Sequence, residues 1–241
     1  MFWAYYIYYI LGIVMLPGIV LGIWAQCKVS ATFNEYNKIE TKHGKKANEV
    51  ARFMLDNAGC INTKIKPIKG ELTDNYNPTE DTVSLSQSVY NNNTVAAVGV
   101  TAHEIGHVFQ HKENYKPIKL RNALVPVINI AGFLAWPLII IGLILEILYF
   151  GTMADVLIYI GIAVYGLNII FCLITLPIEL NASKRAYNML IASAEMDEEE
   201  AKGVKKVLNA AAWTYVAALL TSILSLIRLL LFIFTMRGNR N

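Results

Sequence analysis

The sequence predicts a mainly α-helical, polytopic membrane protein with four transmembrane helices and a small β element. Its 241 residues are 55% hydrophobic and only 16% charged, whereas a soluble domain carries about 25% charged residues. Four apolar stretches each reach the roughly 20 residues that a helix needs to cross a bilayer. We therefore expect a multi-pass protein of the cell membrane that has the lipid bilayer as a partner.

The first apolar stretch covers residues 2–25 and contains no charged residue. A cleaved signal peptide would have a basic segment before a shorter apolar core, but no Lys or Arg precedes this stretch. We therefore predict that residues 1–25 form an uncleaved transmembrane helix. Its aromatic start, from Trp3 to Tyr9, is typical of a belt at the membrane interface.

The main polar segment, residues 26–122, is expected to contain the small β element. A strand is predicted within residues 61–72, broken at Pro67, and residues 75–78 have the composition of a turn. Alternating residue types predict a second strand over residues 82–89. An amphipathic pattern from Lys46 to Gly59 predicts a short helix before these strands.

Two further apolar stretches predict the transmembrane helices of segment 123–176, over residues 123–149 and 153–176. Pro126 and Pro137 lie inside the first of these helices and are expected to kink it.

Residues 177–212 are polar again and have a mostly helical pattern, with an acidic run at 197–200 that we interpret as a solvated helix start. The segment 213–241 contains the last transmembrane helix, over residues 213–236, and a short tail. Its one intramembrane charge is Arg228, which we expect to snorkel or to pair within the helix bundle.

The distribution of basic residues predicts the orientation in the membrane. Four spans place segments 26–122 and 177–212 on one side, and these segments hold 13 and 5 Lys and Arg residues. The connection between the second and third spans holds none, while Arg237 and Arg240 in the tail argue weakly for the opposite orientation. Because basic loops stay in the cytoplasm, both polar segments are expected to be cytoplasmic.

The composition also limits the partners and cross-links of the chain. A formal net charge of +3 is too small to indicate nucleic acid as a partner. The three cysteines, Cys27, Cys60 and Cys172, have no paired spacing, so we expect free thiols rather than a disulfide framework. No feature of the sequence specifies an oligomeric state.

The polar segment carries the motif H-E-x-x-H from His103 to His107. On a helix, His103 and His107 lie one turn apart and about 40° apart around the axis, so both imidazoles can reach one metal ion. Glu104 can then contact a water on that metal without binding the metal itself. This is the zincin arrangement of a Zn2+ site with a glutamate base, although two incidental histidines and an exposed Glu would give the same letters.

The context of the motif favours the zinc site. Asn91 to Thr94 supply helix-capping residues, and the helix predicted from Thr94 to His111 is apolar almost all round. Such a helix should be buried, and buried His and Glu side chains need partners, which a metal provides.

A zinc site needs a third protein ligand. His111 lies about 12 Å along the helix from His103, too far for one ion, and Gln110 and Glu113 stand where the extended zincin motif has Gly and His. Glu179 fits, because Pro177 would start a helix that carries it on the same membrane side as His103. An acidic residue at a helix start, favoured by the dipole, is the alternative interpretation.

Several motifs together resemble a known family. Residues 70–78 with the following strand, the HEIGH helix, and the segments 176–179 and 182–186 are similar to the YugP-type membrane-embedded neutral zinc metallopeptidases. The resemblance runs over nearly the whole chain. The architecture also resembles the HtpX and CAAX prenyl protease group, in which a glutamate after intervening membrane spans is the third zinc ligand.

The resemblance implies that His103, His107 and Glu179 bind Zn2+ and that Glu104 is the base. The wider group has Asp four residues after the ligand Glu, where this chain has Ser183. A hydroxyl at that position could still orient an imidazole.

These features predict a zincin-like cytoplasmic metallopeptidase region in a membrane-bound zinc endopeptidase that cleaves a protein or peptide substrate. The strand over 82–89 could pair with substrate or be a plain structural hairpin, and His111, Arg185 and Tyr187 are candidates for stabilising the oxyanion. The alternative is a non-enzymatic membrane assembly factor with a structural zinc site, which would not need Glu104. A transporter has little support, because the predicted spans contain only three charged residues.

Overall fold

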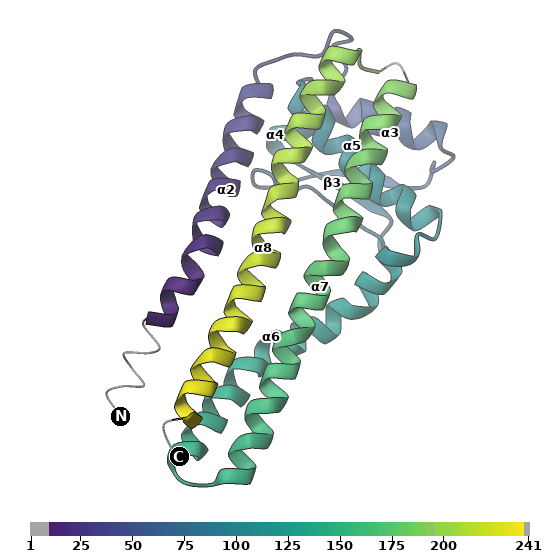
Figure 1. Ribbon diagram of the computed structural model, residues 1–241. Helices are drawn as coiled ribbons and strands as arrows, with labels where there is room; N and C mark the ends of the chain where they lie inside the picture. The colour runs from purple at the N-terminus through teal and green to yellow at the C-terminus, as the bar shows by residue number, and fades with distance from the viewer. Residues whose placement is uncertain (1–9, 194, 239–241) are drawn as a thin grey trace. The chain divides into compact units, whose positions relative to one another are not determined.

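The computed structural model describes residues 10–193 and 195–238, and the chain is mainly helical, as predicted (Figure 1). The expected aromatic belt from Trp3 to Tyr9 lies outside the described residues. The elements in chain order are η1 (Leu11–Met15), α2 (Leu16–Tyr36), α3 (Ala47–Asn57), β1 (Lys64–Ile68), β2 (Asn75–Asn77), β3 (Thr82–Ser86), α4 (Gln87–Tyr90), α5 (Val95–Lys112), α6 (Lys116–Ile147), α7 (Gly151–Ala192) and α8 (Glu198–Gly238).

Four helical stretches in the described part of the chain are long and apolar enough to cross a membrane, which confirms the predicted number. They cover Leu11–Tyr36, Lys116–Ile147, Gly151–Ala192 and Glu198–Thr235. Each is longer than the apolar stretch that predicted it. The bilayer limits the apolar length, but charged residues with good helix propensity can continue the same helix into water.

Contact clustering divides the chain into two compact units. The first contains Met1–Trp24, Leu120–Leu176 and Tyr215–Asn241, and the second contains Ala25–Lys119 and Pro177–Thr214. Helices α2, α6, α7 and α8 therefore contribute residues to both units.

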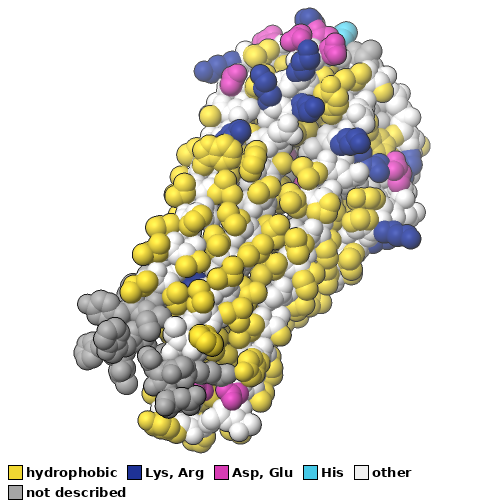
Figure 2. Space-filling model, in the orientation of Figure 1, with side chains coloured by type: hydrophobic (Ala, Val, Ile, Leu, Met, Phe, Trp, Pro, Cys, Tyr) yellow, Lys and Arg dark blue, Asp and Glu magenta, His cyan; other side chains and the backbone are white. Residues whose placement is uncertain are grey.

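The first unit is built from apolar helices that expose large hydrophobic side chains, such as Ile130 and Phe133, as expected for contact with lipid. Hydrophobic side chains cover the helices of this unit on the face shown in Figure 2. Gly142 and Gly161 allow α6 and α7 to pack closely, since a Cβ at Gly161 would lie 2.5 Å from Ile139.

The second unit contains a three-stranded sheet in the order β1-β3-β2. β1 is parallel to β3, and β2 is antiparallel to it. Residues of β3 are buried along its whole length, and the prediction that this strand could pair with substrate is wrong, because both of its edges are occupied. The strand also ends at Ser86, where α4 begins.

Two local predictions in the sheet are also corrected. Asn75–Asn77 forms β2 instead of a turn, because it pairs with β3 over Thr82–Ser84. Pro67 does not break β1 but pairs with Leu85 in its interior. A proline is tolerated there because β1 is an edge strand and one of its sides needs no ladder hydrogen bonds.

Helix α5 lies in the core of the second unit. Thr94 caps its N-terminus by accepting a hydrogen bond from the backbone N–H of Ala97, as the sequence predicted. Ala102 and Ile105 are fully buried and belong to one hydrophobic cluster with Leu55 of α3 and Val83 of β3. This packing gives the motif helix a fixed position.

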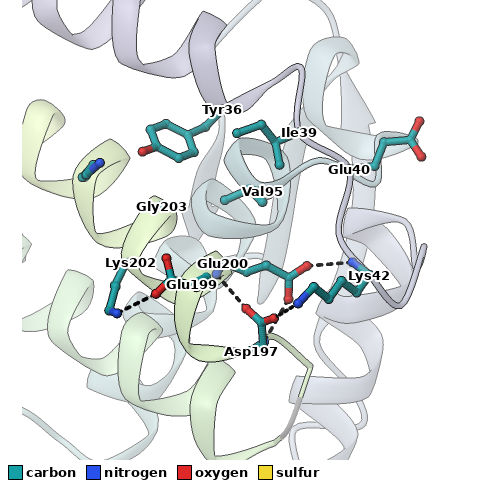
Figure 3. A pocket seen from close by; sticks show the side chains of 11 residues that line it. Tyr36, Ile39, Glu40, Lys42, Val95, Asp197, Glu199, Glu200, Lys202 and Gly203 are labelled. Atoms are coloured by element: carbon teal, nitrogen blue, oxygen red, sulfur yellow. Dashed lines mark hydrogen bonds and ion pairs between the residues drawn. The ribbon is translucent and has the colours of Figure 1, made fainter.

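The acidic run at 197–200 was predicted to be a solvated helix start, but part of it is buried and hydrogen-bonded. Glu200 is 8% exposed and accepts hydrogen bonds from the backbone N–H groups of Lys42 and Asp197. Asp197 accepts from the N–H of Glu200 and forms an ion pair with the Lys42 side chain (Figure 3). These contacts attach the start of α8 to the loop after α2, beside a pocket of about 420 Å³.

Candidate metal centre

His103 and His107 occupy successive turns of α5 and present their rings side by side. The ring centroids are 4.9 Å apart and the ring planes meet at 86°. The side chains of His103 and His107 are 16% and 11% exposed, so neither imidazole is well hydrated. Their spacing on the helix brings both Nε2 atoms to the same side of α5.

Glu179 reaches these two rings from α7. Its Oε2 atom lies 3.2 Å from Nε2 of His103 and 3.4 Å from Nε2 of His107. One ligand atom from each of the three residues lies within 4.8 Å of the others, so the cluster could hold a metal ion. Two imidazole nitrogens and one carboxylate oxygen are a donor set that zinc accepts, with a fourth position left open.

The opposite nitrogen of each ring is also engaged. Nδ1 of His103 lies 3.2 Å from the Ser183 hydroxyl, and Nδ1 of His107 lies 3.0 Å from Oε1 of Gln110. Partners at Nδ1 orient an imidazole and leave Nε2 for the metal. Both rings are therefore held with Nε2 toward Glu179.

The approach of α7 to α5 depends on Gly106, the fourth residue of the motif. A Cβ at this position would lie only 2.7 Å from the backbone oxygen of Ala182. Ala182 stands between Glu179 and Ser183 in α7, so this tight contact lies beside the candidate metal site. Any side chain at Gly106 would push Glu179 away from the histidines.

Glu104 is 8% exposed, and burial raises the pKa of its carboxyl group, an effect that the nearby His103 and His107 partly offset. Burial by itself lowers the pKa of His107, but the hydrogen bond to Glu179 and the charge of Glu104 raise it above its ordinary value. A buried carboxylate next to the two histidines is positioned to accept and release a proton at this site.

The other sequence candidates lie outside the cluster of ligand atoms found in the described residues. The His111 ring makes an edge contact with Tyr76, with centroids 5.5 Å apart. Arg185 pairs with Glu113 at 2.7 Å. Tyr187 lies under the Lys205 ammonium group, which is 5.7 Å from its ring centroid.

Two features of the site differ from the sequence analysis. Pro177 does not start a helix but lies inside α7, where it removes only one backbone hydrogen bond. The second feature is Gln110. In the sequence it stands out only as a departure from the extended zincin motif, yet its side chain is fully buried and contacts His107. The sequence feature that could have predicted this contact is a lone amide side chain in an apolar helix, three residues after a histidine of the motif.

Comparison with known proteins identifies the family. The family model described as "Putative neutral zinc metallopeptidase" matches residues 11–234. The chain belongs to this family. It is also 41% identical over 208 residues to the protein named "Putative membrane protease YugP" from Bacillus subtilis (strain 168), a match that covers 86% of this chain and 89% of the relative. No solved structure matches.

The contact at Gly106 leads to a testable prediction. Gly106→Ala should weaken zinc binding at least about 10-fold, because the backbone of Ala182 cannot move aside without moving Glu179. Overpacking should also destabilise the protein by about 1–3 kcal/mol. Zinc affinity by chelator competition and thermal unfolding of the purified protein measure the two effects.

Gly99→Ala on the same helix is the matched control. The three atoms nearest to its Cβ would all belong to the side chain of Val204, the first at 3.0 Å, and a side chain can adjust. It should leave zinc affinity within about twofold, and both variants gain similar helix propensity. Equal zinc affinities in the two variants would contradict the role of Gly106.

Proposed function

We propose that this member of the family is a membrane-bound zinc endopeptidase in which His103, His107 and Glu179 hold the zinc ion and Glu104 is the general base. The observation that carries the proposal is the convergence of three donor atoms within 4.8 Å, with a buried carboxylate next to His103 in the chain. Three protein ligands leave a position open for water and substrate, as catalytic zinc sites require.

When bound, zinc would polarise the scissile carbonyl and make a water molecule acidic enough to attack it. Glu104 accepts the proton of the attacking water and then gives it to the leaving amine nitrogen. Ser183 and Gln110 hold the rings of His103 and His107 in place during this exchange. The buried position of Glu104 keeps its carboxylate close to the reacting atoms and away from bulk water.

The peptide substrate is expected to bind beside β2. Strand β2 pairs with β3 on one side only within the described residues, and its Tyr76 ring contacts His111 of the motif helix. An extended peptide can add to a free strand edge through backbone hydrogen bonds. This assigns to β2 the role that the sequence analysis gave to the strand over 82–89.

The rival function is a membrane assembly factor that keeps zinc for structure alone. A structural zinc site is closed by four protein ligands, whereas three converge here among the residues described. A structural site also gives no reason for a carboxylate to be buried at Glu104. Catalysis is therefore the function that the site supports best.

The two glutamates should respond differently to substitution. Glu104→Gln should keep zinc near wild-type stoichiometry but lower peptide cleavage by at least about 10²-fold, because it removes the base and no ligand. Glu179→Ala should lose zinc and activity together, with partial recovery in excess zinc. Elemental analysis and a peptide-cleavage assay with and without chelator provide the measurements.

His111→Ala serves as the control on the same helix, since its ring lies outside the cluster. It should retain zinc. Full zinc retention in Glu179→Ala, or zinc loss in His111→Ala, would show that the third ligand was assigned wrongly. Wild-type cleavage by Glu104→Gln would refute the assigned base.

The proposed cytoplasmic active site is tested by labelling single cysteines in a background without Cys27, Cys60 and Cys172. Cysteines at Lys42 and Lys202, whose side chains are 71% and 54% exposed, should react with a membrane-impermeant thiol reagent only after permeabilisation. A cysteine at Tyr149, which is 88% exposed in the α6–α7 connection, should react in intact cells. The reverse pattern would contradict the orientation inferred from the basic residues.

A further inference from the structure

A chain of polar side chains leads from His107 to the surface of the second unit. Gln110 is fully buried; its Oε1 lies 3.0 Å from Nδ1 of His107, and its Nε2 donates to the backbone oxygen of Ile178 at 2.9 Å and to Oδ1 of Asn181 at 3.0 Å. The same Oδ1 accepts a second hydrogen bond, from Nε of Arg185 at 2.8 Å. Four side chains are thus connected without a gap.

The direction of every hydrogen bond in this chain follows from two fixed groups, because the Arg185 guanidinium can only donate and the backbone oxygen of Ile178 can only accept. Asn181 must therefore present its oxygen to Arg185 and, with the same oxygen, to Gln110. Gln110 must then turn its amino group toward Asn181 and its oxygen toward His107. An oxygen can only accept, so the proton of the His107 ring must be on Nδ1.

We propose that Arg185 is a positioning residue that, through Asn181 and Gln110 and together with the backbone oxygen of Ile178, fixes the proton of His107 on Nδ1 and so keeps the Nε2 lone pair free for the metal. The inference rests on the proposed function, because it concerns one of the proposed zinc ligands. It gives Arg185 a role different from that of an oxyanion donor. Nδ1 of His103 has a separate partner, the Ser183 hydroxyl.

Arg185 is well placed for this task. Its Nη1 donates to Glu113, the C-cap residue of α5, at 2.7 Å, and its guanidinium carbon lies 5.9 Å from the centroid of the Tyr115 ring. These contacts hold the guanidinium group while its Nε points at Asn181. Without Arg185, Asn181 could rotate and present its amino group to the amino group of Gln110, which would leave the backbone oxygen of Ile178 alone to hold Gln110 in the orientation that His107 needs.

The test exploits the symmetry of a carboxylate. Aspartate at position 181 has oxygen at both ends, so it can accept from Gln110 without being oriented by Arg185. Arg185→Met should weaken zinc binding by about 10-fold in the wild-type background and by less than about twofold in the Asn181→Asp background. Zinc affinity of the purified full-length protein is measured by chelator competition.

Two comparisons separate this role from others. Removing a positive charge by itself favours cation binding, so a purely electrostatic effect of Arg185→Met would tighten zinc binding. Glu113→Gln breaks the exposed ion pair without touching Asn181 and should change zinc affinity by less than about threefold. If Arg185→Met does not fold, Arg185→Leu, which also has no donor, allows the same comparison in both backgrounds.

Unchanged zinc affinity in Arg185→Met, or equal weakening in both backgrounds, would overturn the inference and leave the proposed peptidase intact. Conversely, a wild-type protein that binds zinc but cleaves no peptide would refute the proposed function. The predicted rescue by Asn181→Asp would still establish the positioning role in that case, since the readout is metal affinity.

Discussion

The site depends on one packing contact, the backbone-to-backbone approach of α5 and α7 at Gly106 and Ala182. It sets the separation of two helices whose side chains must meet within hydrogen-bond distance. His103 and His107 come from one helix and Glu179 from the other, so the separation decides whether three donor atoms converge. Protein interiors are packed too tightly to absorb even one extra methyl group at such a contact.

The polar groups in this interface are costly to bury unless each has a partner. Gln110 meets this requirement with three contacts, to His107, Ile178 and Asn181, although it is fully buried. Such a network stabilises one arrangement of the two helices and disfavours slightly shifted ones. The residues proposed as metal ligands and their supporting side chains are thus part of the same helix packing that forms the second unit.

The sequence predicted the local features of the site and few of the distant ones. The H-E-x-x-H spacing defines a helix face by itself, and a helix over Thr94 to His111 followed from capping and hydrophobicity. Glu179 is 76 residues from His103, and its prediction depended on two spans that return the chain to the same side, on Pro177 as a helix start and on the family resemblance. The central position of β3 could not be predicted, because β1 pairs with it in parallel and passes over the intervening β2. Pro177 lies within α7 and does not start a helix, because a proline that is favoured at a helix start can also be tolerated inside a helix.

The central claim is that two imidazoles and one carboxylate hold zinc, and X-ray absorption at the zinc edge of the purified protein tests it most directly. We predict a four-coordinate ion with two imidazole ligands at about 2.0–2.1 Å, oxygen in the remaining positions and no sulfur. A sulfur shell at about 2.3 Å, or a third imidazole, would contradict the account.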